Sequence, residues 1–84
     1  MTRDEAETIV RSMFEIVLNR SIGPTENISR ESEGGWDSVR HIELLFMLEE
    51  EFGFTFDENE MSELNTFDEI VDKVVVRATD SNPR

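Results

Sequence analysis

The residues best suited to chemistry lie in one short segment, Asp37-Ser38-Val39-Arg40-His41. Ser38 offers a hydroxyl that can act as a nucleophile or carry a covalent group, and His41 offers an imidazole base. If a helix begins at Ser38, free backbone N–H groups and the helix dipole surround the hydroxyl with a field that favours an anion. A negatively charged group attached to Ser38 would therefore be stabilised there.

A hydrolase with a Ser38, His41 and Asp37 relay is the enzymatic interpretation of the same segment. We disfavour it, because neighbours on one helix rarely adopt the geometry of such a relay, and neither an oxyanion hole nor a substrate cleft is evident. We expect the protein not to be an enzyme and the His41 side chain to be solvated or to face a partner. In the plainest alternative, Asp37 and Ser38 only cap a helix.

Metal and disulfide chemistry are both disfavoured by composition. The chain has no cysteine and a single histidine, which excludes disulfides and leaves too few ligands for structural zinc. The acidic run at residues 57–60 lacks the alternation and central glycine of a calcium loop, so we expect a solvated turn. No metal site is predicted.

Charge and length restrict the partners and the size of the fold. The 84 residues carry a formal charge of −12, which disfavours binding to nucleic acid or to an anionic membrane and favours partners with basic patches. A chain of this length forms one domain, residues 1–84, with a core over about 4–78 and a frayed tail at 79–84. With no apolar run long enough to span a bilayer and no signal peptide, we expect a cytoplasmic monomer.

Four helices are predicted from apolar spacing and capping residues. A long loop at residues 21–35, rich in Gly, Pro, Asn and Ser, follows the first helix, and its Ile22 and Ile28 tie it to the core. Phe54 and Phe56 are expected to be extended anchors in the core, and Thr66 to Glu69 to form a capping box. The predicted fold is an all-α four-helix bundle with one short helix, and its helices span residues 4–19, 37 or 38–52, 60–64 and 67–78.

The segment Gly34-Gly35-Trp36-Asp37-Ser38-Val39, with Glu43-Leu44, Leu48-Glu49-Glu50-Glu51-Phe52 and Thr66 after it, resembles the acyl carrier protein family. That family has Asp-Ser-Leu at the start of its second helix and then an acidic, apolar helix. The resemblance covers about residues 9–75. It implies an acyl-carrier-like fold, with phosphopantetheine attached to Ser38 by a phosphopantetheinyl transferase and Asp37 as its motif neighbour. The arm would carry acyl or aminoacyl groups as thioesters.

The resemblance also implies a partner surface along the second helix. Over residues 37–60, eight acids stand against one arginine, which suits basic patches on the transferase and on the loading and processing enzymes. The surface is expected to comprise Trp36, Val39, Arg40, Ile42, Glu43, Phe46 and Glu49. The interior is expected to contain Leu44, Leu48, Phe52, Phe56, Leu64, Phe67, Val71 and Val74.

Two positions depart from fatty-acid carriers, which commonly have an acid in place of Arg40 and a smaller residue in place of Trp36. These departures favour a specialised pathway, such as polyketide or nonribosomal peptide synthesis, over housekeeping fatty-acid synthesis, which stays an alternative. An unmodified acidic adaptor that binds a partner through the second helix is a further hypothesis. Modification of Ser38 distinguishes the carrier from the adaptor.

Overall fold

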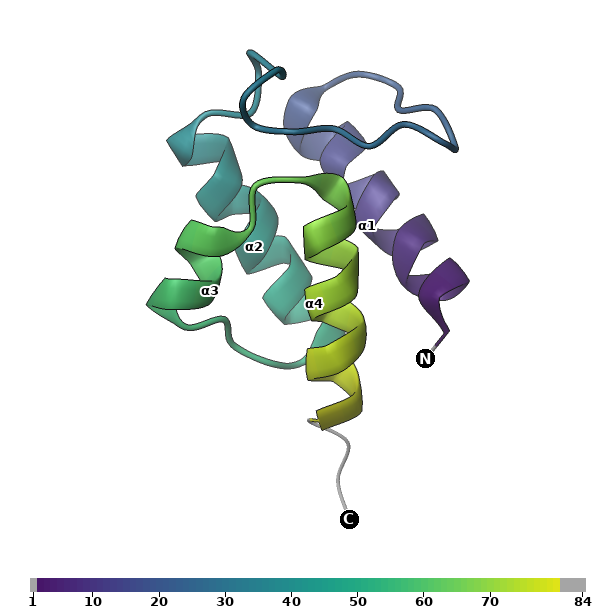
Figure 1. Ribbon diagram of the computed structural model, residues 1–84, viewed down its shortest axis with the longest axis vertical. Coiled ribbons are helices and arrows are strands. Elements are labelled where there is room, and N and C mark those ends of the chain that lie inside the picture. Colours follow the sequence, from purple (N-terminus) through teal and green to yellow (C-terminus); the bar gives the residue numbers. More distant parts are fainter. Residues whose placement is uncertain (1, 81–84) are drawn as a thin grey trace.

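The computed structural model describes residues 2–80 of the chain, and the side chains of residues 2–78. Within them, four helices follow in the order α1 (Arg3–Leu18), α2 (Ser38–Phe52), α3 (Glu58–Glu63) and α4 (Phe67–Asp80). Helix α1 packs against both α2 and α4, and the long loop crosses one end of the bundle (Figure 1). The predicted all-α bundle with one short helix is confirmed. The expected frayed tail at residues 79–84 is wrong for residues 79 and 80, which belong to α4, and its remainder lies outside the described residues.

The helix boundaries follow from local capping. Thr2 begins α1 with a capping box to Glu5, and Asp57 begins α3 in the same way. That box starts α3 two residues earlier than we predicted. At the other ends, Asn19 and Gly53 close α1 and α2 in the left-handed conformation, with φ of 55° and 76°.

The start of α4 differs in detail from the predicted capping box. Thr66 Oγ1 accepts the backbone N–H of Glu69 at 3.1 Å, as expected, but the Glu69 carboxylate accepts the N–H of Asn65 instead of that of Thr66. Thr66 forms an isolated antiparallel bridge with Ser29 of the long loop. This pairing keeps the backbone before α4 extended and ties the loop to it.

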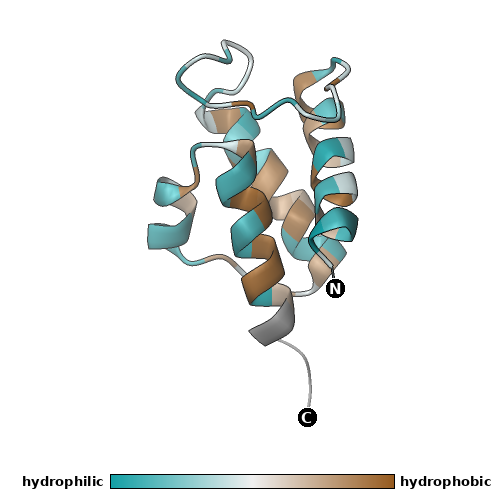
Figure 2. Cartoon of the chain, turned by 45° about the vertical axis from the view of Figure 1, so that its right-hand side comes forward, coloured by the Kyte–Doolittle hydropathy of each residue, from teal (hydrophilic) through white to brown (hydrophobic). Residues whose placement is uncertain are grey.

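The core lies where α1, α2 and α4 face one another, and the outward sides of α1 and α3 are mainly hydrophilic (Figure 2). Phe54 and Phe56, in the segment that joins α2 to α3, are buried, as predicted, and so are the loop residues Ile22 and Ile28. Phe52 is only partly buried and packs against this core. The other predicted core residues are buried, namely Leu44, Leu48, Leu64, Phe67, Val71 and Val74.

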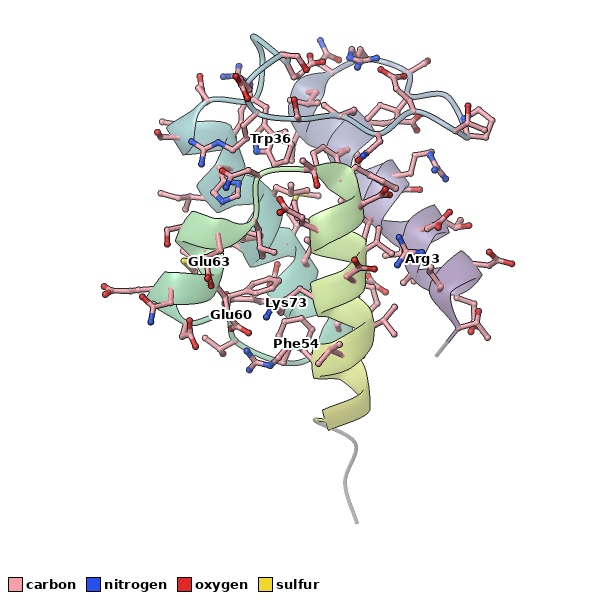
Figure 3. All side chains as sticks on the ribbon, in the orientation of Figure 1. Arg3, Trp36, Phe54, Glu60, Glu63 and Lys73 are labelled. Carbon is pink, nitrogen blue, oxygen red and sulfur yellow. The ribbon has the colours of Figure 1, made fainter. Side chains whose placement is uncertain are left out.

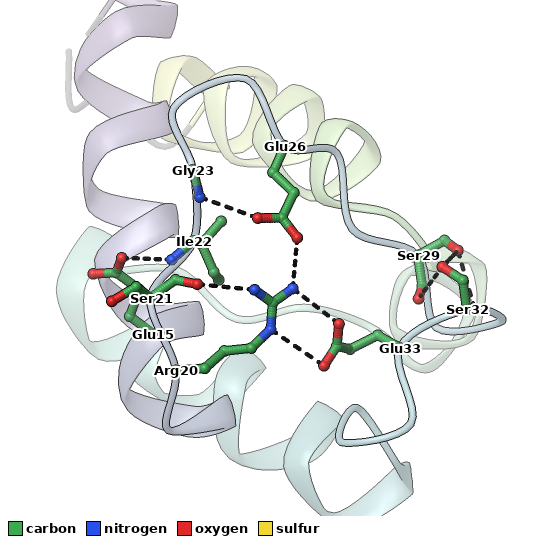
Figure 4. Close-up of polar contacts among 9 residues, drawn as sticks. All are labelled: Glu15, Arg20, Ser21, Ile22, Gly23, Glu26, Ser29, Ser32 and Glu33. Atoms are coloured by element: carbon green, nitrogen blue, oxygen red, sulfur yellow. Dashed lines mark hydrogen bonds and ion pairs between the residues drawn. The ribbon is translucent and has the colours of Figure 1, made fainter.

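An arginine at the end of α1 holds the first half of the long loop. The Arg20 guanidinium bonds the carboxylates of Glu26 and Glu33 and the carbonyl of Ser21 (Figure 4). The bonds to the two carboxylates raise the pKa of Arg20. The Glu15 carboxylate accepts the backbone N–H of Ile22 at 2.9 Å. Polar contacts at both ends of the segment therefore give a loop of this length a defined path.

The acidic run at residues 57–60 is not the solvated turn that we expected. Glu60 is buried and its carboxylate pairs with Arg77 and with Lys73 of α4, while it also accepts the N–H of Asp57 (Figure 3). Burial raises the pKa of Glu60, but the bonds to Arg77 and Asp57 outweigh it, so the pKa is lowered. The run anchors α3 to α4.

Candidate functional site

Ser38 is the first residue of α2, and its side chain is exposed. Among the described residues, its hydroxyl has no hydrogen-bond partner. The backbone N–H groups of the first turn of a helix lack partners within the helix. Those of Ser38 and Val39 have no partner among the described residues, so they are available to stabilise an anion on this hydroxyl. The hydroxyl is therefore accessible, unengaged and in a field that suits a phosphate ester.

Asp37 is the N-cap of α2 and does not compete for Ser38. One carboxylate oxygen accepts the backbone N–H of Arg40 at 2.9 Å, and the other accepts the Arg40 guanidinium at 3.1 Å. The bond from the Arg40 N–H is the main reason that the pKa of Asp37 is lowered. The carboxylate next to the serine thus remains charged, with Arg40 as its counterion.

Trp36 and His41 form a buried pair beneath Ser38, contrary to our expectation that both face solvent or a partner. They are 3% and 5% exposed. Trp36 Nε1 donates to His41 Nδ1 at 3.0 Å, and the indole packs edge-on against Phe14 with centroids 4.8 Å apart. Figure 3 shows Trp36 pointing inward from the long loop. Trp36 therefore does not belong to the partner surface.

Both nitrogens of His41 are engaged. Because Nδ1 accepts the indole proton, the ring proton lies on Nε2, which donates to the carbonyl of Met61 at 2.7 Å. Burial lowers the pKa of His41, which keeps the ring neutral, and the charge of Arg30 acts in the same direction. His41 thus joins α2, α3 and the long loop, and it is not positioned as a base for Ser38.

The lowered pKa of His41 predicts that the protein loses stability on mild acidification. Above pH 6.5, the ordinary pKa, the ring is neutral in both the folded and unfolded states. Below it, the unfolded chain binds a proton that the folded chain resists, so the free energy of unfolding falls, by at most about 1.4 kcal/mol per pH unit. Urea unfolding across this pH range, followed by Trp36 fluorescence, measures the loss.

His41→Gln is the control for this pH dependence, because it removes the titrating ring. The variant should be less stable near neutral pH but show a flat free energy of unfolding until carboxylates begin to protonate, near their ordinary value of 4.5. If the free energy of unfolding fell equally steeply in both proteins between pH 6.5 and 4.5, a group other than His41 would be responsible.

An open depression of about 250 Å³ lies beside Ser38. The loop, α2 and α3 all contribute to its lining, which consists of Arg30, Ser38, His41, Ile42, Glu58, Met61 and Ser62. Arg30, Met61 and Ser62 were not predicted as site residues. No local pattern marks them, since only the packing of α3 and the loop against α2 brings them to the serine.

An exposed apolar strip continues from Ser38 along α2. Val39, Ile42 and Phe46 are 65%, 47% and 55% exposed. Glu43 is also exposed, whereas Glu49 is half-buried and its carboxylate accepts the N–H of Phe56 at 2.7 Å. The structure thus brings together most of the residues expected on the partner surface, whereas the Glu49 carboxylate bonds the backbone that follows α2.

No helix in the described part of the chain is long and apolar enough to cross a bilayer.

Comparisons with known proteins identify the family and the fold of the chain. The family model described as "Phosphopantetheine attachment site" matches residues 8–74, most of the chain. Among solved structures, a protein from Mycobacterium tuberculosis, titled as a candidate acyl carrier protein, superposes with a TM-score of 0.77 and 22% identity. The match covers 86% of this chain and 97% of that one, and it shows the same fold. No curated protein sequence matches.

Proposed function

Because the chain belongs to the phosphopantetheine attachment site family, whose members are non-catalytic carriers, we propose that Ser38 is the residue that bears its phosphopantetheine arm. The chain is thus a carrier protein and not an enzyme. The observation that supports Ser38 is its exposed, unbonded hydroxyl at the first position of α2. The site fits the cofactor, since it combines a helix N-terminus with an adjoining open depression.

The other described serines are poorer candidates. Four of them have hydroxyls that already hydrogen-bond within the protein, namely Ser12, Ser29, Ser32 and Ser62. Ser21 has an exposed side chain, but it follows the end of α1 and does not begin a helix. Only Ser38, among the serines described, combines a free hydroxyl with a helix N-terminus.

The chemistry of attachment asks little of this chain. A bond forms between Ser38 Oγ and the phosphorus that carries pantetheine in coenzyme A, and the pyrophosphate bond breaks to release adenosine 3′,5′-bisphosphate. The serine proton passes to the transferase, because His41 is buried and fully bonded. When attached, the arm supplies a thiol that holds acyl groups as thioesters. Ser38 contributes the anchor, and Asp37 maintains the helix start next to it.

The proposal is tested by incubating the folded protein with coenzyme A and a broad-specificity phosphopantetheinyl transferase, then mapping the adduct by peptide mass spectrometry. One adduct per chain, on the peptide that contains Ser38, is expected. An adduct on another serine would refute the assignment of Ser38.

We further propose that the arm carries acyl or aminoacyl intermediates of polyketide, nonribosomal peptide or another specialised biosynthesis, in the cytoplasm, where coenzyme A is available. The partner enzymes would dock on the exposed α2 strip of Val39, Ile42 and Phe46, with Glu43 meeting their basic residues. Support for a specialised pathway comes from Arg40, which places an exposed cation on this acidic face. Trp36 gives no such support, because it is buried.

Arg40→Glu tests the contribution of this cation to partner choice. If Arg40 selects against fatty-acid enzymes, the variant should become a better substrate for a fatty-acid malonyl transferase, by about two- to tenfold in kcat/KM, through removal of like-charge repulsion. The loaded holo-proteins are compared by intact mass, with Arg40→Gln as the intermediate control. An unchanged or lower kcat/KM for Arg40→Glu would contradict this role.

A further inference from the structure

Arg30 is an unusual cation in this acidic chain, because its guanidinium has no hydrogen-bond or ion-pair partner among the described residues. Every other basic side chain that the structure describes forms an ion pair or a hydrogen bond. Arg3, Arg20, Arg40, Lys73 and Arg77 pair with carboxylates, and Arg11 bonds the carbonyl of Pro24. With twenty acidic residues in the sequence, an unpaired arginine calls for a physical explanation.

The backbone holds Arg30 in place while its side chain stays available. Its N–H donates to the carbonyl of Asn65 at 2.9 Å, next to the Ser29–Thr66 bridge that ties the loop to α4. The side chain is half-buried and lines the depression beside Ser38. Because the backbone is already fixed, binding a ligand there would cost only the rotamer entropy of the side chain.

We propose that Arg30 binds the phosphodiester of the arm on Ser38 and so holds the first part of the arm in the depression between the loop, α2 and α3. The inference rests on the proposed attachment at Ser38. A phosphodiester on this hydroxyl is an anion beside the same depression, and arginine presents a planar fork of donors that matches phosphate oxygens. The apolar side chains of Ile42 and Met61 line the path beyond the phosphate.

The charges around Ser38 favour Arg30 over Arg40 for this contact. The Arg40 guanidinium is 3.1 Å from the Asp37 carboxylate, which is its counterion, and its side chain is exposed. Glu58 also lines the depression, but it forms no ion pair with Arg30. A phosphodiester would thus meet one available cation, Arg30. Arg40 provides a control with the same charge that is exposed and already paired with Asp37.

The experiment compares apo and holo forms of the wild type, Arg30→Gln, Arg30→Lys and Arg40→Gln. Intact mass first confirms complete modification, and urea unfolding then measures the folding equilibrium constant of each form. The gain in this constant on modification should be about two- to fivefold larger in wild type than in Arg30→Gln, as for a partly exposed ion pair. The difference should shrink in high salt, and the ³¹P resonance should shift in holo Arg30→Gln.

The controls separate a specific contact from a general effect of charge. Arg40→Gln should keep the wild-type gain in folding equilibrium constant on modification and the wild-type ³¹P chemical shift. Arg30→Lys should lie between wild type and Arg30→Gln in both quantities, since lysine keeps the charge without the fork. The inference would be overturned if modification stabilised wild type and Arg30→Gln equally, or if Arg40→Gln reduced this stabilisation as much as Arg30→Gln does. Either result would leave attachment at Ser38 intact. Absence of any adduct on the folded wild type would overturn both.

Discussion

Replacing Ser38 with alanine should abolish phosphopantetheine attachment completely and leave the fold intact. The exposed hydroxyl makes no hydrogen bond among the described residues, and the cap of α2 is Asp37, so the expected cost in stability is within about 0.5 kcal/mol. Loss of the adduct would therefore reflect loss of the attachment atom. Intact mass after incubation with coenzyme A and the transferase measures modification, and circular dichroism verifies the helices.

Two other serine variants make this result specific. Ser62 lines the same depression as Ser38, and Ser21 has an exposed side chain elsewhere on the loop. Ser62→Ala and Ser21→Ala should both be modified at the wild-type stoichiometry. If folded Ser38→Ala still gained an adduct, Ser38 would be a helix residue only and the arm would lie on another side chain.

Replacing Trp36 with alanine should destabilise the protein by about 3–5 kcal/mol, the range for truncating a buried aromatic side chain. The ring is 3% exposed, packs on Phe14 and donates to His41, so its removal leaves both a cavity and an unpaired Nδ1. Because small domains are stable by only about 5–15 kcal/mol, a large part of the total would be lost. Urea unfolding followed by circular dichroism measures this loss of stability. Fluorescence cannot be used, because Trp36 is the sole tryptophan and the variant lacks it.

A conservative variant separates packing from the hydrogen bond. Trp36→Phe keeps an aromatic ring against Phe14 but removes the donor to His41, so a smaller loss of about 1–3 kcal/mol is expected. Val39→Ala, on the exposed part of α2, should change stability by less than about 0.5 kcal/mol. If Trp36→Ala were as mild as Val39→Ala, the indole would not contribute to the core in solution.

The starts and ends of the helices could be predicted from sequence because they depend on neighbouring residues. Asp37 caps α2 by accepting an N–H three residues later, and Gly53 ends it by adopting a positive φ that glycine tolerates. The same local motif predicted that Ser38 lies at the start of this helix. Residues such as Phe54 and Phe56 were predictable as core because so small a domain buries most of its aromatic rings.

The burial of His41 was missed, although a local signal for it exists. His41 precedes Leu44, Leu45 and Leu48 by three, four and seven residues, which places it on the buried face of α2. Imidazole is polar, so its burial depends on partners, and Trp36 and Met61 supply them from the loop and from α3.

The sequence by itself determined the helices, the capped serine at the start of α2 and the acidic character of the chain, since each depends on local spacing or on composition. Only the tertiary structure decided what surrounds that serine. The loop and α3 pack against α2 from distant parts of the chain, which buries the Trp36–His41 pair beneath Ser38 and places Arg30 beside it. The contacts that bring Arg30 and Met61 to the serine join segments far apart in the sequence, and no local pattern predicts them.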